Sequence, residues 1–260
     1  MHINFCEIQW IIFTNFIYFS YDGAAYHGWQ VQPNAVTVQQ VLEEALATIV
    51  REPVALTGAG RTDAGVNALC MVAHADFGKE VDTAQLVYKL NRILPPDIAV
   101  STMRRVKDGA HARFDAVSRR YNYHVITAKS PFARRYACRV HGEIDFEAMN
   151  NAAKVLYEYS DFTSFSKLHT DVKTNNCKVT YAAWRKVGDC EWVFEIEADR
   201  FLRNMVRAIV GTLLLVGRGK MSIDGFRQVI EKKARGEAGD SAMGEALFLV
   251  GVEYPDSLFL

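Results

Sequence analysis

The chain has 260 residues, half of them hydrophobic, with 30 basic and 30 acidic residues. This length and composition allow one large core or two smaller ones. Because the net charge is zero, it gives no argument for nucleic-acid binding, and only a local cluster of basic residues can support such binding. The five cysteines lie far apart and form no CxxC pair, which predicts reduced thiols in a cytoplasm and no structural zinc site.

An apolar and aromatic run occupies Ile8–Phe19, near the start of the chain. It is too short and too often interrupted by polar residues for a membrane span, which needs about 20 apolar residues. It also lacks the basic start and the cleavage site of a signal peptide. Its second half is therefore predicted to be a buried strand that leads into Tyr21.

The first half of the chain alternates predicted strands and helices. Thr37 and Gln40 have the spacing of a capping box, and apolar residues follow at helical spacing up to Val50, which predicts an amphipathic helix. A second helix is predicted over Thr83–Leu94, where Pro95 ends it. Strands are predicted for the end of the N-terminal apolar run and for Pro53–Thr57, Ala68–Phe77 and Ile98–Val106. The resulting order, β-α-β-β-α-β, matches a ferredoxin-like or RNA-recognition unit.

The segment Gly58–Asn67 joins two of these predicted strands and contains three glycines. Glycines permit backbone angles and close approaches that side chains forbid. On this loop Asp63 follows Arg61 by two residues, so a carboxylate lies between two rigid elements as a candidate reactive group. Gly, Asp and Thr are also ordinary turn residues, so composition alone leaves a simple turn open.

Positive charge is concentrated between Arg104 and Arg139, a stretch with ten Arg or Lys residues and two acids. Aromatic residues interleave with the basic ones, and RNA offers phosphates for basic groups and unpaired bases for stacking on rings. The stretch is a candidate RNA-binding surface, while a solvated basic surface fits the composition equally well. Within it, Tyr121 and Tyr123 share one face of a predicted strand by period two.

The second half of the chain also mixes helices and strands. Asp145 is the expected N-cap of a helix, and a polar loop is predicted at Lys167–Lys178. Apolar and polar residues alternate around Trp192–Asp199, as in an antiparallel strand with one buried face. A last helix is capped by Ser222, and Ala246–Tyr254 is predicted to be the closing strand.

A strongly apolar helix is predicted to start near Phe201 and to end at Gly217. Arg203 and Arg207 stand at i and i+4, on one face of that helix. The apolar neighbours of Arg207 predict partial burial, and a buried charge needs a partner.

The string Gly60-Arg61-Thr62-Asp63-Ala64-Gly65-Val66 resembles the active-site signature of the TruA-type tRNA pseudouridine synthases. Further segments resemble other motifs of that family in the same order, and together they cover the chain from about residue 21 to residue 254: Tyr21–Gln32, His111–Phe114, Arg119–Tyr123, Phe201–Arg207 and Ala246–Tyr254. The resemblance implies an α+β fold, in which two ferredoxin-like or RRM-like halves form a mostly antiparallel central sheet with helices on one side. We expect the N-terminal half, with the catalytic loop, to span residues 1–110 and the C-terminal half to span residues 111–260.

The resemblance also implies an isomerase that converts uridine to pseudouridine in tRNA, on the 3′ side of the anticodon stem-loop at positions 38 to 40. Asp63 matches the catalytic carboxylate, Arg207 the arginine paired with it, and Tyr121 the tyrosine that lies against the target base. Arg61 is expected at the backbone of the target nucleotide or in the space that the base leaves. The carboxylate either adds to C1′ or takes a proton from C2′, and the sequence leaves both routes open.

No cofactor and no metal are expected, because the reaction adds and removes no atoms and has no redox step. The implied partners are tRNA and a second copy of the chain, in a cytoplasmic homodimer. Asn67 stands where the family usually has histidine, which bears on positioning or specificity rather than on the chemistry. In the basic stretch, five residues are expected to contact RNA: His111, Arg113, Phe114, Arg119 and Arg120.

Two other functions remain open at this point. The first is a non-catalytic RNA-binding protein on the same scaffold, which has little need for Asp63. The second is a nucleosidase or glycosidase, but such enzymes usually place a pair of carboxylates around the bond, and the loop holds one acid. Hydrolysis releases free base whereas isomerisation does not, so the two reactions are easily separated.

Overall fold

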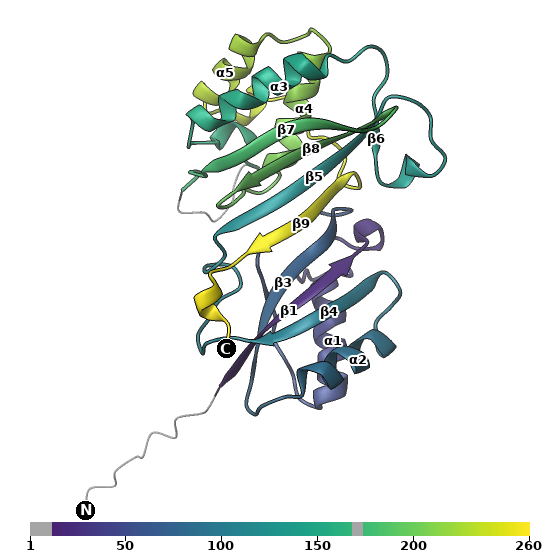
Figure 1. Cartoon of the computed structure of the whole chain (residues 1–260), viewed down its shortest axis with the longest axis vertical. Helices are drawn as coiled ribbons and strands as arrows, with labels where there is room; N and C mark the ends of the chain where they lie inside the picture. Colours follow the sequence, from purple (N-terminus) through teal and green to yellow (C-terminus); the bar gives the residue numbers. More distant parts are fainter. Residues whose placement is uncertain (1–11, 168–173) are drawn as a thin grey trace, which may run out of the picture.

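The computed structural model describes residues 12–167 and 174–260 (Figure 1). Within these ranges nine strands form one sheet, in which seven strands follow the order β4-β1-β3-β9-β5-β8-β7, while β2 pairs with β3 and β6 with β5. The strands are β1 Phe13–Tyr21, β2 Thr57–Gly58, β3 Asn67–Phe77, β4 Ile98–Arg105, β5 Ser118–Ile126, β6 Cys138–Arg139, β7 Val179–Gly188, β8 Glu191–Ala198 and β9 Leu247–Glu253. The α-helices are α1 Val38–Val50, α2 Thr83–Ile93, α3 Phe146–Lys154, α4 Met205–Gly217 and α5 Ile223–Glu231.

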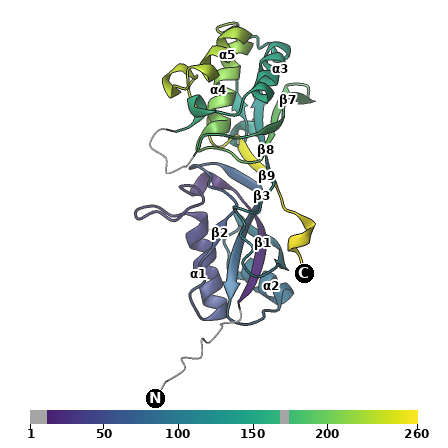
Figure 2. The same ribbon diagram turned by 90° about the vertical axis from the view of Figure 1, so that its left-hand side faces the viewer.

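The two parts of the sheet meet at a short parallel pairing between β3 and β9. It joins Asn67 and Ala68 of β3 to Phe248 and Leu249 of β9. The ladders on either side of this junction are antiparallel. Helices α1 and α2 lie beside the N-terminal strands, and α3, α4 and α5 lie beside the C-terminal strands (Figures 1 and 2). The expected α+β fold with a mostly antiparallel sheet is confirmed.

The strand predicted at Pro53–Thr57 is mostly absent, and β2 starts only at the last of these residues. Side chains from α1 bind the backbone of Leu56 instead. Nε2 of Gln39 donates to the Leu56 carbonyl oxygen at 2.9 Å, and the Leu56 N–H donates to Oε1 of Glu43 at 2.8 Å. These contacts satisfy backbone groups that would otherwise need a partner strand.

Helix α4 begins at Met205, not near Phe201 as the sequence predicts. The residue before it, Asn204, has a left-handed backbone with φ of 68°, which interrupts helical geometry, and its Nδ2 donates to Oγ of Ser241 at 2.7 Å. Arg203 therefore lies in the turn before the helix. The apolar residues of α4 are almost all buried and form the core of the C-terminal part.

Three further predictions concern the ends and loops of the chain. The buried strand that leads into Tyr21 is present as β1, and its Phe16 is fully buried against the rings of Tyr254 and Phe259. Half of the polar loop predicted at Lys167–Lys178 lies outside the described residues. Of the helices within the described ranges, none combines the length and the apolar composition that crossing a bilayer requires.

Candidate active site

Asp63 lies on the loop between β2 and β3, with an arginine on each side of its carboxylate. Nη1 of Arg207 is 3.2 Å from Oδ2, and Nε of Arg203 is 3.6 Å from Oδ1. The side chains of Asp63 and Arg207 are each 22% exposed, whereas that of Arg203 is 51% exposed. The carboxylate is thus ion-paired and still reaches solvent.

The backbone of this loop is held by the segment that follows β1. The N–H of Trp29 donates to the Thr62 carbonyl oxygen at 3.4 Å, and the N–H of Gly65 donates to the Tyr26 carbonyl oxygen at 3.4 Å. The approach requires glycine at position 28, where φ is +88° and a Cβ would lie 2.2 Å from the Thr62 oxygen. Trp29 and Tyr26 are buried, so both aromatics support the loop.

Arg207 is fixed from two directions. Its Nε donates to the carbonyl oxygen of Ala242 at 2.6 Å, while its Nη1 faces Asp63. The N–H of Ala242 donates back to the Arg207 carbonyl oxygen at 3.0 Å. A guanidinium held in this way presents its planar set of N–H donors in one orientation. The ammonium group of lysine has no such fixed set of donors.

Tyr121 of β5 lies in the interior beside this ion pair. It is 8% exposed, and the edge of its ring meets the ring of Phe201 at 5.2 Å between centroids. Burial raises the pKa of Tyr121 to about 12; the charge of Arg119 lowers it in part, and the charge of Asp63 adds to the rise. The hydroxyl therefore keeps its proton at neutral pH and is available as a hydrogen-bond donor.

Three of the residues expected to contact RNA lie on the loop between β4 and β5. Nδ1 of His111 accepts hydrogen bonds from the backbone N–H groups of Arg113 and Phe114, at 3.1 and 3.3 Å. The Phe114 ring packs at 4.2 Å on the imidazole and is 74% exposed. Arg113 is exposed as well, and so is Arg61 on the loop that carries Asp63.

The other two residues expected to contact RNA, Arg119 and Arg120, have different surroundings. Arg119 is 8% exposed, and its guanidinium donates to backbone carbonyls in the interior. Arg120 is exposed on the opposite face of β5 from Tyr121, where it pairs with Glu197 and Glu253 at 3.0 and 3.1 Å. These positions favour a structural role for Arg119 and place Arg120 away from Asp63.

The sequence prediction omits two residues that the structure brings to the site. Arg203 contacts the Asp63 carboxylate, and Phe201 packs on Tyr121. The spacing of Arg203 and Arg207 was the available signal for the first. For Phe201 the signal was its place at the start of the segment Phe201–Arg207, although its contact with Tyr121 depends on the turn that precedes α4.

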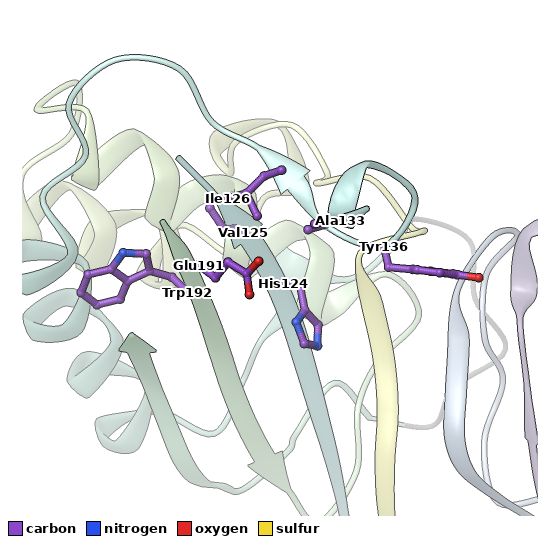
Figure 3. A pocket seen from close by; sticks show the side chains of 8 residues that line it. His124, Val125, Ile126, Ala133, Tyr136, Glu191 and Trp192 are labelled. Carbon is purple, nitrogen blue, oxygen red and sulfur yellow. The ribbon is translucent and has the colours of Figure 1, made fainter. Parts of the chain in front are cut away.

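A cavity of about 90 Å³ lies on the C-terminal part, below the loop that follows β5 (Figure 3). Its volume is well below the roughly 300 Å³ at which ligand pockets begin. None of the residues predicted for the site is among those that line it: His124, Val125, Ile126, Ala133, Tyr136, Ala137, Glu191 and Trp192. It therefore has no part in the arrangement around Asp63.

Comparisons with known proteins agree on one family. A family model described as tRNA pseudouridine synthase matches residues 17–115 and 152–255. A protein of Bacteroides thetaiotaomicron named tRNA pseudouridine synthase A is 61% identical over 246 residues, which are 94% of this chain and 91% of that protein. A protein of the same name from Bacteroides fragilis is 59% identical over 245 residues, covering 94% of this chain and 97% of the relative. One from Chlorobaculum tepidum is 40% identical over 235 residues, with 90% and 95% covered.

The matched ranges include the loop of Asp63 and the turn and helix that carry Arg203 and Arg207. The identity extends over nearly the full length of the chain and of each of these relatives. The chain therefore belongs to the tRNA pseudouridine synthase family and is an isomerase.

Proposed function

We propose that the chain converts uridine to pseudouridine in tRNA, with Asp63 as the catalytic carboxylate. The observation that carries this proposal is the carboxylate flanked by Arg207 and Arg203, beside the buried hydroxyl of Tyr121. The two arginines place positive charge on both sides of a partly buried carboxylate. A non-catalytic RNA-binding protein has no use for this arrangement, which is why we favour the enzyme.

Two routes give the same product from these residues. In the first, a carboxylate oxygen of Asp63 bonds to C1′ as the C1′–N1 bond breaks and its electron pair leaves on uracil. The base turns, C5 bonds to C1′ with release of the carboxylate, the C5 proton passes to water and N1 takes up a proton. In the second, the carboxylate takes the C2′ proton as the C1′–N1 bond breaks and its electron pair leaves on uracil, which gives a glycal. C5 then bonds to C1′ as the protonated carboxyl returns its proton to C2′, the C5 proton passes to water and N1 takes up a proton. No atoms are gained or lost overall, so no cofactor is required.

We assign three further roles as part of this proposal. Tyr121 stacks on the uracil and holds it as it turns, and Arg207 keeps the carboxylate aimed. Arg61 contacts the target nucleotide from the solvent side of the same loop. A base inside a stem must first leave the stack, which costs a few kcal/mol and is offset by contacts to phosphates. His111, Arg113 and Phe114 are the residues we assign to those contacts.

The substrate we propose is the 3′ side of the tRNA anticodon stem-loop, at positions 38 to 40. We further propose a homodimer that works in the cytoplasm, with a catalytic N-terminal half at residues 1–110 and an RNA-binding C-terminal half at residues 111–260. The four cysteines among the described residues are unpaired, which suits a reducing compartment.

The test uses unmodified tRNA transcripts that carry tritium at uridine C5. Wild-type protein is expected to release tritium to water, and Asp63→Asn is expected to lose at least about 10²-fold in rate while it still binds RNA. Asp189→Asn, the same change at an exposed position between β7 and β8, serves as the matched control and is expected to keep full activity.

Either alternative function has a distinct result. Binding without tritium release by the wild type, across several tRNAs, would identify a binding protein. Release of free uracil would identify a hydrolase. Undiminished release by Asp63→Asn would remove this carboxylate from the mechanism.

A further inference from the structure

The guanidinium of Arg119 lies inside the protein and donates to four backbone carbonyls. The acceptors are the carbonyl oxygens of Ala59, Arg113, Ala116 and Asp199, at 3.0, 2.5, 2.9 and 2.7 Å. They belong to three separate segments, namely the start of the catalytic loop, the loop between β4 and β5, and the turn that leads to α4. Because bonds from a charged donor are strong, one buried cation fixes three backbone segments relative to one another.

Each of these segments also carries an arginine that reaches solvent. Arg61 stands two residues after Ala59, Arg113 supplies one of the acceptor carbonyls, and Arg200 directly follows Asp199. Arg61 and Arg113 are exposed, and Arg200 is half-buried. Because carbonyl groups in all three segments accept from the one guanidinium of Arg119, the backbone that carries Arg61, Arg113 and Arg200 converges on one point.

These three positive charges have little local compensation. Among the described residues, none of the three arginines forms a salt bridge. The carboxylates closest in sequence have other partners. Asp63 pairs with Arg207 and Arg203, Asp115 accepts from the N–H of His111 at 2.7 Å, and Asp199 accepts from the N–H groups of Lys178 and Arg200, both at 2.7 Å. Like charges held together repel, so an anion among them relieves that repulsion.

We propose that Arg61, Arg113 and Arg200 form one binding site for the phosphodiester backbone of the substrate RNA, and that Arg119 is the positioning residue that assembles it. A guanidinium pairs with two phosphate oxygens at once, and three of them from different directions fix a phosphate in place. Arg61 shares its loop with Asp63, so a strand whose uridine reaches the carboxylate brings neighbouring phosphates to this side. The inference rests on the proposed function for the identity of the RNA.

The first experiment measures binding of an unmodified tRNA transcript as a function of KCl. Arg113→Gln and Arg200→Gln are each expected to bind roughly tenfold more weakly and to lower the slope of log affinity against log salt by about 1. The double variant is expected to lose less than the product of the single losses, because both residues hold the same phosphate. Arg92→Gln, at an exposed position of α2, is the matched control and is expected to bind like the wild type.

The second experiment tests the positioning role with Arg119→Lys, which keeps the net charge. A lysine cannot reach four acceptors, so we expect this variant to lose roughly as much affinity and salt slope as the double variant, although all three surface arginines remain. The salt slope of binding is the readout for this variant, because Arg119 also bonds the start of the loop that carries Asp63 and its loss is expected to slow tritium release as well. Thermal unfolding shows whether the variant is folded, and if it is not, the first experiment still decides the phosphate site.

Several outcomes would overturn the proposal. Strictly additive losses from Arg113→Gln and Arg200→Gln would mean separate contacts and no common site. A folded Arg119→Lys protein with the wild-type salt slope would remove the positioning role. Binding of inorganic phosphate that the arginine variants abolish, with RNA binding unaffected by the same variants, would assign the cluster to a free anion. If the wild type bound the transcript but released no tritium, the proposed function would fail while these binding comparisons would still be valid.

Discussion

Arg207 and Asp63 are 144 positions apart in the chain, yet their side chains meet at 3.2 Å between Nη1 and Oδ2. The pair joins the first turn of α4 to the loop between β2 and β3, so it spans the two parts of the sheet. Arg203 reaches the other carboxylate oxygen at 3.6 Å from the turn before the helix. The two arginines have the same charge and the same partner but differ in exposure and anchoring, and this difference leads to the first prediction.

Arg207→Lys is expected to slow tritium release at least about tenfold, the equivalent of one charge-assisted hydrogen bond of about 1.5 kcal/mol. The reason is that Arg207 uses two separate nitrogens, Nε for Ala242 and Nη1 for Asp63, whereas lysine has a single nitrogen for both. Arg203→Lys is expected to cost less than about fivefold, because exposed ion pairs contribute roughly 0–1 kcal/mol. Single-turnover rates at saturating tRNA compare the two variants directly. Equal losses would show that net charge near the carboxylate matters and that the anchoring of Arg207 does not.

The second prediction concerns Tyr121 at alkaline pH. An ordinary tyrosine ionises near pH 10, whereas burial raises the pKa of Tyr121 to about 12. The unfolded chain therefore loses this proton at a lower pH than the folded chain, and the free energy of unfolding falls as pH rises from about 10 to 12, by up to ~3 kcal/mol from this residue. In Tyr121→Phe this contribution is absent, so its unfolding free energy should fall less steeply over the same range. Urea unfolding between pH 9 and 11 measures both proteins, and parallel curves would contradict the assignment.

How far the sequence predicted this site depends on whether the signal was local. The start of α1 was predictable because Thr37 and its helix follow one another in the chain, and Oγ1 of Thr37 does accept from the N–H of Gln40. The late start of α4 was not, because the left-handed Asn204 bonds to Ser241, 37 positions away. The β2 strand was shortened for the same kind of reason, since α1 side chains occupy the backbone of Leu56.

In the basic stretch, the period-two alternation of the strand could have predicted the burial of Arg119. Arg119, Tyr121 and Tyr123 alternate on β5, so the period that put the two tyrosines on one buried face also put Arg119 there. Arg120 faces the other way, and its partners come from β8 and β9, whose place beside β5 no local pattern specifies. The cluster of Arg61, Arg113 and Arg200 likewise joins segments that only the fold brings together.

The third prediction compares two glycines near the catalytic loop. Gly28→Ala is expected to lower the free energy of unfolding by about 2–4 kcal/mol, because a Cβ there would sit 2.2 Å from the Thr62 carbonyl oxygen and the backbone has φ of +88°. Gly60→Ala is the matched control within the signature string, since a Cβ at Gly60 meets nothing within 4 Å. It is expected to leave stability unchanged or to raise it by up to ~1 kcal/mol. Thermal and urea unfolding of both variants provide the comparison, and a larger loss for Gly60→Ala would contradict it.

The last prediction concerns Asn67, at the position where the resemblance of the sequence to the family implies a histidine. Its side chain is buried and bridges two segments: Oδ1 accepts from the N–H of Gly23 at 2.8 Å, and Nδ2 donates to the Glu245 carbonyl oxygen at 2.8 Å. Asn67→Ala leaves the buried N–H of Gly23 without a partner, so it is expected to lower the free energy of unfolding by about 1–3 kcal/mol, whereas Asn34→Ala, at an exposed position, should have almost no effect.

Asn67→His then tests whether the usual residue performs the same task. A neutral imidazole has one donor and one acceptor, which matches the two bonds that the amide makes. If Asn67 is only a bridge between Gly23 and Glu245, Asn67→His should recover at least half of the stability that Asn67→Ala loses, and tritium release should follow stability in both variants. If Asn67→His is stable but slow, or if Asn67→Ala loses activity without losing stability, the residue acts on the catalytic loop directly and the bridge is not its main role.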